Sequence, residues 1–365
     1  MTRHVASCRW AGAVAATVLV GGAACAPARP PERPVSPVTA IAAEPARLTW
    51  QLKVREHVDL WLHGWAMVLP DTAPVPLFRR GWRDETTVLK NQRGILTALD
   101  TSLAWLREGV RRNPNLAQGQ FVAQLAPTLL ELQRGLEAFE ASGGNPRRAG
   151  DQAAIVAALA QSFTTPADRA WLKRFAQGLQ DEYDRWFHQW WVEQQRLRAG
   201  VIAAAAATWQ GTLRDRVAPF LRETRQLNGE GLLVLPLGGE GRTVMLGPQQ
   251  PSAAVGLPPR VDQANEVVFT LIHEQAGMLA LQVVADNTTP AEKRAGIADR
   301  LSAAAAVRAG ALLLDRVAPT LAEGYRQFYL AEARATGQPF EQVFALPPVV
   351  AAGLVRQLDL MLGGL

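Results

Sequence analysis

The chain has 365 residues, of which 48% are hydrophobic, so it is long enough and apolar enough to bury a sizeable core. Its 38 basic and 33 acidic residues leave a formal net charge of only +5, and no basic stripe concentrates it, which excludes nucleic acid as an expected partner. The two cysteines, Cys8 and Cys25, both lie near the start, so no disulfide within the body can stabilise the fold.

Residues 1–24 have the features of a secretory signal peptide. Arg3 and Arg9 make its start positive, and an uncharged, mostly apolar run follows over 10–24. This run is shorter than the roughly 20 residues that a membrane-spanning helix needs. We therefore expect the chain to be exported.

Cys25 directly follows the small residues that end this leader. The placement resembles the lipobox of bacterial lipoproteins, in which the cysteine becomes the lipidated first residue, although Gly22 stands where that family usually has an aliphatic residue. The resemblance implies a protein that a lipid on Cys25 anchors in the bacterial cell envelope, on the periplasmic or extracellular face of a membrane. Cleavage without lipidation and an uncleaved anchor are the alternatives.

Residues 25–46 contain six prolines, a density that favours an extended, semi-rigid tether. From there the apolar periodicity predicts a helical region over 47–226. Thr165-Pro166-Ala167-Asp168 has the composition of a helix start, with threonine as the N-cap and proline in the first turn. The same pattern recurs at 289–292.

One predicted helix carries aromatic residues at helical spacing. A platform for glycans or lipids is one interpretation, but such a stripe more often belongs to a hydrophobic core, which we expect here. The charged residues between the aromatic ones are expected to form a solvated face. The aromatic residues are Trp171, Phe175, Tyr183, Trp186, Phe187, Trp190 and Trp191, and the charged ones are Asp181, Glu182, Asp184 and Arg185.

The remaining region, 227–365, begins with β-type sequence. Two short runs, 232–237 and 242–246, flank Gly238-Gly239-Glu240-Gly241 and predict a β-hairpin, with Pro236 favouring an edge position for the first strand. A long proline-rich loop is expected over 247–263, and helices from there to the end. The predicted fold is mainly α, a multi-helix domain with a small β-hairpin.

Two segments resemble each other. Residues 203–223 and 303–323 align at a constant offset and share Asp-Arg-Val-Ala-Pro. An internal duplication and a coincidence of alanine-rich sequence both remain open. In each segment the proline is expected to kink a helix or to mark its end.

His273 and Glu274 lie in a predicted helix that is apolar on nearly every side. The run that leads to them resembles the active-site helix of zincin metallopeptidases, in which a His binds zinc and the adjacent Glu acts as the base. The resemblance implies an α+β zincin-like C-terminal half in which His273 is a metal ligand and Glu274 is catalytic. Gly277 stands where the family has its second His, and Glu323 or Glu292 would have to supply a third ligand.

Other polar residues suggest weaker sites. Asp59 and His63 are four residues apart, so they share a helix face and could join a ligand set or simply bond to each other on a half-buried helix. His57 points to another side of that helix. The charged segment 79–85 is expected to be a helix start rather than an anion pocket.

Two functions remain. The first is a non-catalytic envelope lipoprotein that needs no cofactor and binds a protein or a cell-wall ligand. The second is a remodelled zincin-like hydrolase that uses zinc at His273 and Glu274. The missing second histidine favours the first function.

Overall fold

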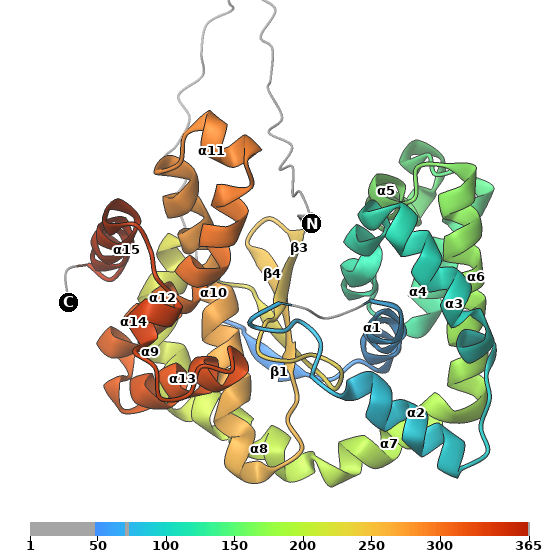
Figure 1. Cartoon of the computed structure of the whole chain (residues 1–365), viewed down its shortest axis with the longest axis horizontal. Helices are drawn as coiled ribbons and strands as arrows, with labels where there is room; N and C mark the ends of the chain where they lie inside the picture. The colour runs from blue at the N-terminus through green and yellow to red at the C-terminus, as the bar shows by residue number, and fades with distance from the viewer. Residues whose placement is uncertain (1–47, 70–72, 364–365) are drawn as a thin grey trace, which may run out of the picture.

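A computed structural model describes residues 48–69 and 73–363 of the protein. The expected leader, Cys25 and the tether lie outside the described residues. The described chain is mainly helical with one four-stranded sheet, which confirms the predicted fold class. The sheet lies between two groups of helices, and α7 (His188–Leu197) and α8 (Ala199–Thr208) run from one group to the other (Figure 1).

The sheet is mixed, with the strand order β1-β2-β4-β3. β2 pairs in parallel with both β1 and β4, and β3 pairs antiparallel with β4. The predicted hairpin between 232–237 and 242–246 is therefore wrong, because β4 lies between these two segments. The strands are β1 (Gln51–Lys53), β2 (Glu230–Val234), β3 (Arg242–Gly247) and β4 (Gln250–Gly256).

The loop predicted over 247–263 contains β4. Its sequence has a proline, a serine and two alanines but only one β-branched residue, Val255, so strand propensity alone does not reveal it. Residues from Pro251 to Val255 are buried, and this tertiary burial stabilises the strand. The edge position predicted for β2 is also wrong, since β2 is central and Pro236 follows its last residue.

The first helical group precedes β2. Thr165 and Asp168 form the capping box expected at the start of α6. The aromatic residues of the predicted stripe pack into the core as expected, with Tyr183 and Trp191 partly buried. The elements are α1 (Glu56–Val68), α2 (Trp82–Gln92), α3 (Ala98–Arg112), η1 (Pro114–Leu125), α4 (Leu129–Ala141), η2 (Pro146–Arg148), η3 (Gly150–Gln152), α5 (Ala153–Ser162), α6 (Pro166–Glu182), the π-helix η4 (Tyr183–Phe187), α7, α8, the π-helix η5 (Trp209–Leu213) and α9 (Arg214–Glu223).

The second helical group follows β4 and is built around its longest helix, α10. The segment Val261–Asp286 has the length and apolar composition of a membrane span, yet 72% of its most apolar window is buried in the protein, as in the core helix of a globular domain. Thr289 and Glu292 form the second expected capping box. The elements are η6 (Val261–Gln263), α10 (Ala264–Asp286), α11 (Pro290–Arg294), α12 (Ile297–Val317), α13 (Pro319–Glu332), α14 (Phe340–Val343) and α15 (Pro348–Met361).

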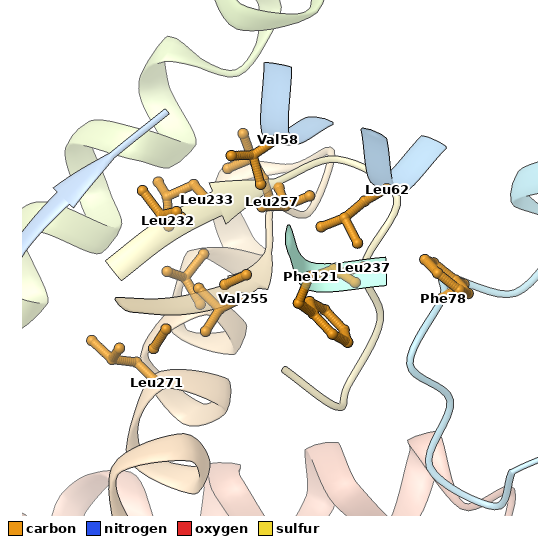
Figure 2. Close-up of a cluster of buried hydrophobic side chains, with 14 of the residues drawn as sticks. Val58, Leu62, Phe78, Phe121, Leu232, Leu233, Leu237, Val255, Leu257 and Leu271 are labelled. Atoms are coloured by element: carbon orange, nitrogen blue, oxygen red, sulfur yellow. The ribbon is translucent and has the colours of Figure 1, made fainter. Parts of the chain in front are cut away.

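The sheet joins the two helical groups through a shared core. Figure 2 shows Val58 and Leu62 of α1 gathered with Leu233 of β2, while Leu271 of α10 approaches Val255 of β4 from the other side. Helices thus cover both faces of the sheet, which explains why β2 is buried along its whole length.

The two similar segments differ in local structure. Pro219 lies inside α9, whereas Pro319 is the first residue of α13 after α12 has ended. The same five-residue sequence is therefore accommodated in two ways, and duplication stays a prediction.

Candidate functional site

His273 and Glu274 lie in the middle of α10, where its surroundings change from core to surface. His273 is almost fully buried, and its ring centroid lies 5.3 Å from that of Tyr329 on α13. Its Nε2 is 3.8 Å from Oε1 of Glu274, too far for a hydrogen bond, and its Nδ1 has no hydrogen-bond partner. The expected buried pair is present, but its two members are neighbours rather than bonded partners.

Glu274 faces the start of β3. The hydroxyl of Thr243 donates a hydrogen bond of 2.8 Å to Oε2 of Glu274. Gly241 permits this approach, because a Cβ on it would lie 2.6 Å from the carbonyl oxygen of Ala254 and 2.8 Å from Cγ of Glu274. In the sequence Gly241 indicated only a turn, so its role in bringing β3 close to α10 was missed.

The surroundings move the two pKa values in opposite directions. Burial, with a smaller effect of the nearby Arg242 charge, lowers the pKa of His273 to about 4. Burial raises the pKa of Glu274 to about 7, against the opposing effects of Arg242 and the hydrogen bond from Thr243. His273 is therefore neutral at pH 7, while Glu274 changes its charge near that pH.

The donors around His273 do not fit a zinc site. Within residues 48–69 and 73–363, no group of three or more His, Cys, Asp or Glu side chains is placed to hold a metal ion. Glu323 is exposed and accepts a hydrogen bond from Gln327, and Glu292 caps α11. Both residues that the sequence offered as a third ligand therefore bond to other partners.

Gly277 leaves open space at the position of the missing histidine. A Cβ built on Gly277 would meet only Cβ of Ala306 on α12 within 4 Å, at 3.9 Å. The glycine is not required by packing there, and it lies one helical turn beyond Glu274 on the same side of α10.

β3 is an edge strand with exposed apolar side chains. Met245 and Leu246 are 43% and 40% exposed, and on the adjacent face of α10 Met278 and Leu281 are 41% and 55% exposed. α10 and β3 run in the same direction (Figure 1). Thr243 and Glu274 are in contact, so they give a common starting point for β3 and α10. Two residues along β3 and four residues along α10 both cover about 6 Å, so Met245 and Met278 lie at a similar height. We call Met245, Leu246, Glu274, Gly277, Met278 and Leu281 the β3 edge surface.

Asp59 and His63 belong to a different, enclosed part of the protein. Helix α1 is buried rather than half-buried, and the two side chains bond to different partners. Asp59 accepts hydrogen bonds from Nε1 of Trp191, at 2.7 Å, and from the backbone N–H of Leu235, at 2.6 Å. These contacts fix α1 between α7 and the end of β2, which is a structural role.

His63 is part of a buried ionic network centred on Glu182. Nζ of Lys90 lies 2.8 Å from both carboxylate oxygens of Glu182, and Nε2 of His63 lies 3.1 Å from Oε1. The hydroxyl of Thr97 also donates to Glu182. Trp82 donates to Nδ1 of His63, so the proton of the ring is on Nε2, facing Glu182.

The prediction that Glu182 lies on a solvated face is wrong, because its side chain is fully buried. The reason is Lys90, a partner 92 residues away that supplies the opposite charge inside the core. His57 bonds to the carbonyl oxygen of Ala126, as suits a residue on another side of α1. The charged segment 79–85 is a helix start, as expected, with Arg79 paired to Glu85.

A surface hollow lies elsewhere, beside α15. Its lining residues are Ala352, Val355, Arg356, Asp359, Leu360 and Gly363. The hollow shares no residue with the β3 edge surface, so the two are separate features.

Comparisons of the chain with protein-family models, with curated proteins and with solved structures found no match.

Proposed function

We propose that the protein is an exported, lipid-anchored component of the bacterial cell envelope that binds an extended polypeptide segment without catalysing a reaction. The observation that carries the proposal is the open edge of β3, with apolar side chains exposed beside it on both the strand and α10. The leader and Cys25 support export and anchoring from the sequence alone.

An extended polypeptide is the ligand that an edge strand suits best. The outer side of such a strand presents backbone N–H and C=O groups that another strand can pair with. Within the described residues, no backbone hydrogen bond outside the pairing with β4 involves 242–247. η1 packs against β3, where Nε2 of Gln124 lies 3.4 Å from the carbonyl oxygen of Arg242 and the guanidinium of Arg242 lies over the ring of Phe121. The exposed residues of the strand, Met245 and Leu246, are left for a partner.

The donor set supports binding over metal-dependent hydrolysis. A catalytic zinc site needs three protein ligands, and His273 is the one ligand expected here, with no group of three His, Cys, Asp or Glu side chains placed to complete the set among the described residues. Glu274 is already held by Thr243. A carboxylate positioned against an edge strand is consistent with contact to a bound chain.

Hydrogen–deuterium exchange of the full-length chain in detergent micelles tests strand addition. The probe is a random library of capped hexapeptides, and we expect it to slow amide exchange over 242–247 while leaving the opposite edge, 51–53, unchanged. Met245→Lys should abolish the protection, whereas Leu360→Lys, the same kind of change at an exposed apolar residue on α15, should not. Absence of protection at β3 at millimolar peptide would refute the proposal.

The zincin-like hydrolase is the competing function. The position of Glu274 beside an edge strand favours it, because an enzyme of that kind aligns its substrate on such a strand. Metal analysis of the purified native protein and of His273→Ala separates the two functions. Stoichiometric zinc that is lost in the variant would support the hydrolase, and metal-free native protein after zinc loading would end it.

A further inference from the structure

The β3 edge surface has an open position next to a carboxylate. Gly277 follows Glu274 by one helical turn, and the space where its side chain would be is bordered only by Ala306. Other glycines on buried helix faces differ, since a Cβ on Gly310 would lie 2.1 Å from the hydroxyl of Tyr325. The room at Gly277 is therefore a local feature that a group from outside can enter.

The charges around this position favour a cation. Glu240 and Glu274 lie close enough that the charge of Glu240 raises the pKa of Glu274. One guanidinium, that of Arg242, lies 3.3 Å from Glu240 and also acts on Glu274. Two carboxylates therefore face one guanidinium at this place. A positive group brought to Gly277 would relieve part of this repulsion.

His273 adds an independent observation. It is more than nine-tenths buried, and its Nδ1 has no hydrogen-bond partner. A buried polar atom without a partner is rare in a folded protein and marks a place where a ligand or water can complete the bonding.

We propose that the β3 edge surface selects an extended polypeptide carrying a lysine or arginine, whose cation lies over Gly277 and pairs with Glu274. The proposal rests on the proposed function and adds the chemistry of the ligand. Side chains on one face of a strand are two residues and about 6.6 Å apart, close to the rise of about 6 Å from Glu274 to Met278. The bound segment should therefore have an apolar residue two positions from the basic one, in contact with Met245 and Met278.

Binding should strengthen as the pH rises through about 7, because the ion pair needs Glu274 in its charged form. Five other titratable or charged groups face Glu274. They are His273 on its own helix, Arg242 on β3, Glu240 in the loop before β3, and Tyr325 and Tyr329 on α13. The tyrosines have strongly raised pKa values and His273 a lowered one, so near pH 7 Glu274 is the member of this set that changes charge.

Two capped, fluorescently labelled hexapeptides test the inference on the full-length chain in detergent micelles. One has the sequence Ser-Lys-Val-Leu-Val-Ser, and the other has norleucine, which keeps the aliphatic length, in place of lysine. Fluorescence anisotropy should give about tenfold tighter binding of the lysine peptide at pH 8, and a smaller preference at pH 6.

Two variants locate the effect. Glu274→Gln should remove the preference for lysine at both pH values, and Gly277→Leu, which fills the open position, should remove it without changing Glu274. A cooperative thermal unfolding transition, like that of the native protein, confirms that each variant is folded. Equal affinity of the native protein for both peptides would overturn the inference and leave strand addition standing, whereas no binding of either peptide would overturn the proposed function as well.

Discussion

Replacing Lys90 by methionine should strongly destabilise the protein, because it leaves the carboxylate of Glu182 buried without its positive partner. Both oxygens of Glu182 lie 2.8 Å from Nζ of Lys90. Breaking a buried ion pair from one side costs about 3–5 kcal/mol. The hydrogen bonds from His63 and Thr97 remain, so we expect a loss near the lower end, about 3 kcal/mol.

The pKa of Glu182 gives a figure for the whole buried network, in which His63 contributes more than Lys90. Burial alone raises this pKa, but the hydrogen bond from His63 and the charge of Lys90 outweigh it and hold the pKa at about 2, against 4.5 for a free glutamate. Such a depression corresponds to about 3 kcal/mol of stability at neutral pH. Because the folded-state pKa is the lower one, this stability is present above pH 4.5 and is lost as the pH falls towards 2.

Urea unfolding of the full-length chain at pH 7, followed by circular dichroism, measures the effect. The matched control is Lys173→Met, which removes an exposed pair with Glu140 at a similar distance of 2.7 Å and should cost less than about 1 kcal/mol. Adding Glu182→Gln to Lys90→Met should recover part of the loss. If Lys90→Met is no more destabilising than Lys173→Met, the buried network does not contribute as reasoned.

Three further results are expected. Cys25→Ala should move the protein from the membrane to the soluble fraction of fractionated cells, and its retention on the membrane would show that this residue is not the anchor. Gly241→Ala should lower the free energy of unfolding in urea by about 1–3 kcal/mol, because the added Cβ meets the backbone of Ala254. Gly277→Ala should raise it by about 0.5–1 kcal/mol, because alanine favours a helix over glycine and has room there. Equal effects of the two changes would contradict the packing at β3. Burial raises the pKa of Asp59 to about 7 from 3.8, so the folded state holds this proton more tightly and the unfolding free energy should fall as the pH rises from about 4 to 7. Asp59→Asn should reduce that slope in urea titrations at pH 5 and 7.5, and an unchanged slope would assign it to other groups.

Local sequence was sufficient where local chemistry determines structure. The capping boxes at Thr165 and Thr289 and the buried helix around His273 depend on neighbours within a few residues or on simple periodicity. These features were predicted and are present. The same holds for the aromatic core residues of α6, which repeat with the period of a helix.

Features that depend on distant partners were not predictable in this way. β4 is a strand because α10 and the neighbouring strands bury it, although its own composition is unfavourable. Glu182 looks like its exposed neighbours in the sequence until Lys90 is placed beside it. For the candidate site, the sequence indicated His273 and Glu274 but not Thr243, since the contact spans 31 residues and requires β3 to lie on the outer edge.

The bonds around β1 would give a lipid anchor on Cys25 a mechanically strong attachment to the body. Trp50, just before β1, donates a 2.5 Å hydrogen bond to the carbonyl oxygen of Gln226 and accepts one of 2.7 Å from Trp209. Just beyond the other end of β1, Arg55 pairs with Glu230 of β2. A force applied along β1 from its N-terminal end would load these bonds and the pairing with β2 together, in shear, instead of opening them one after another.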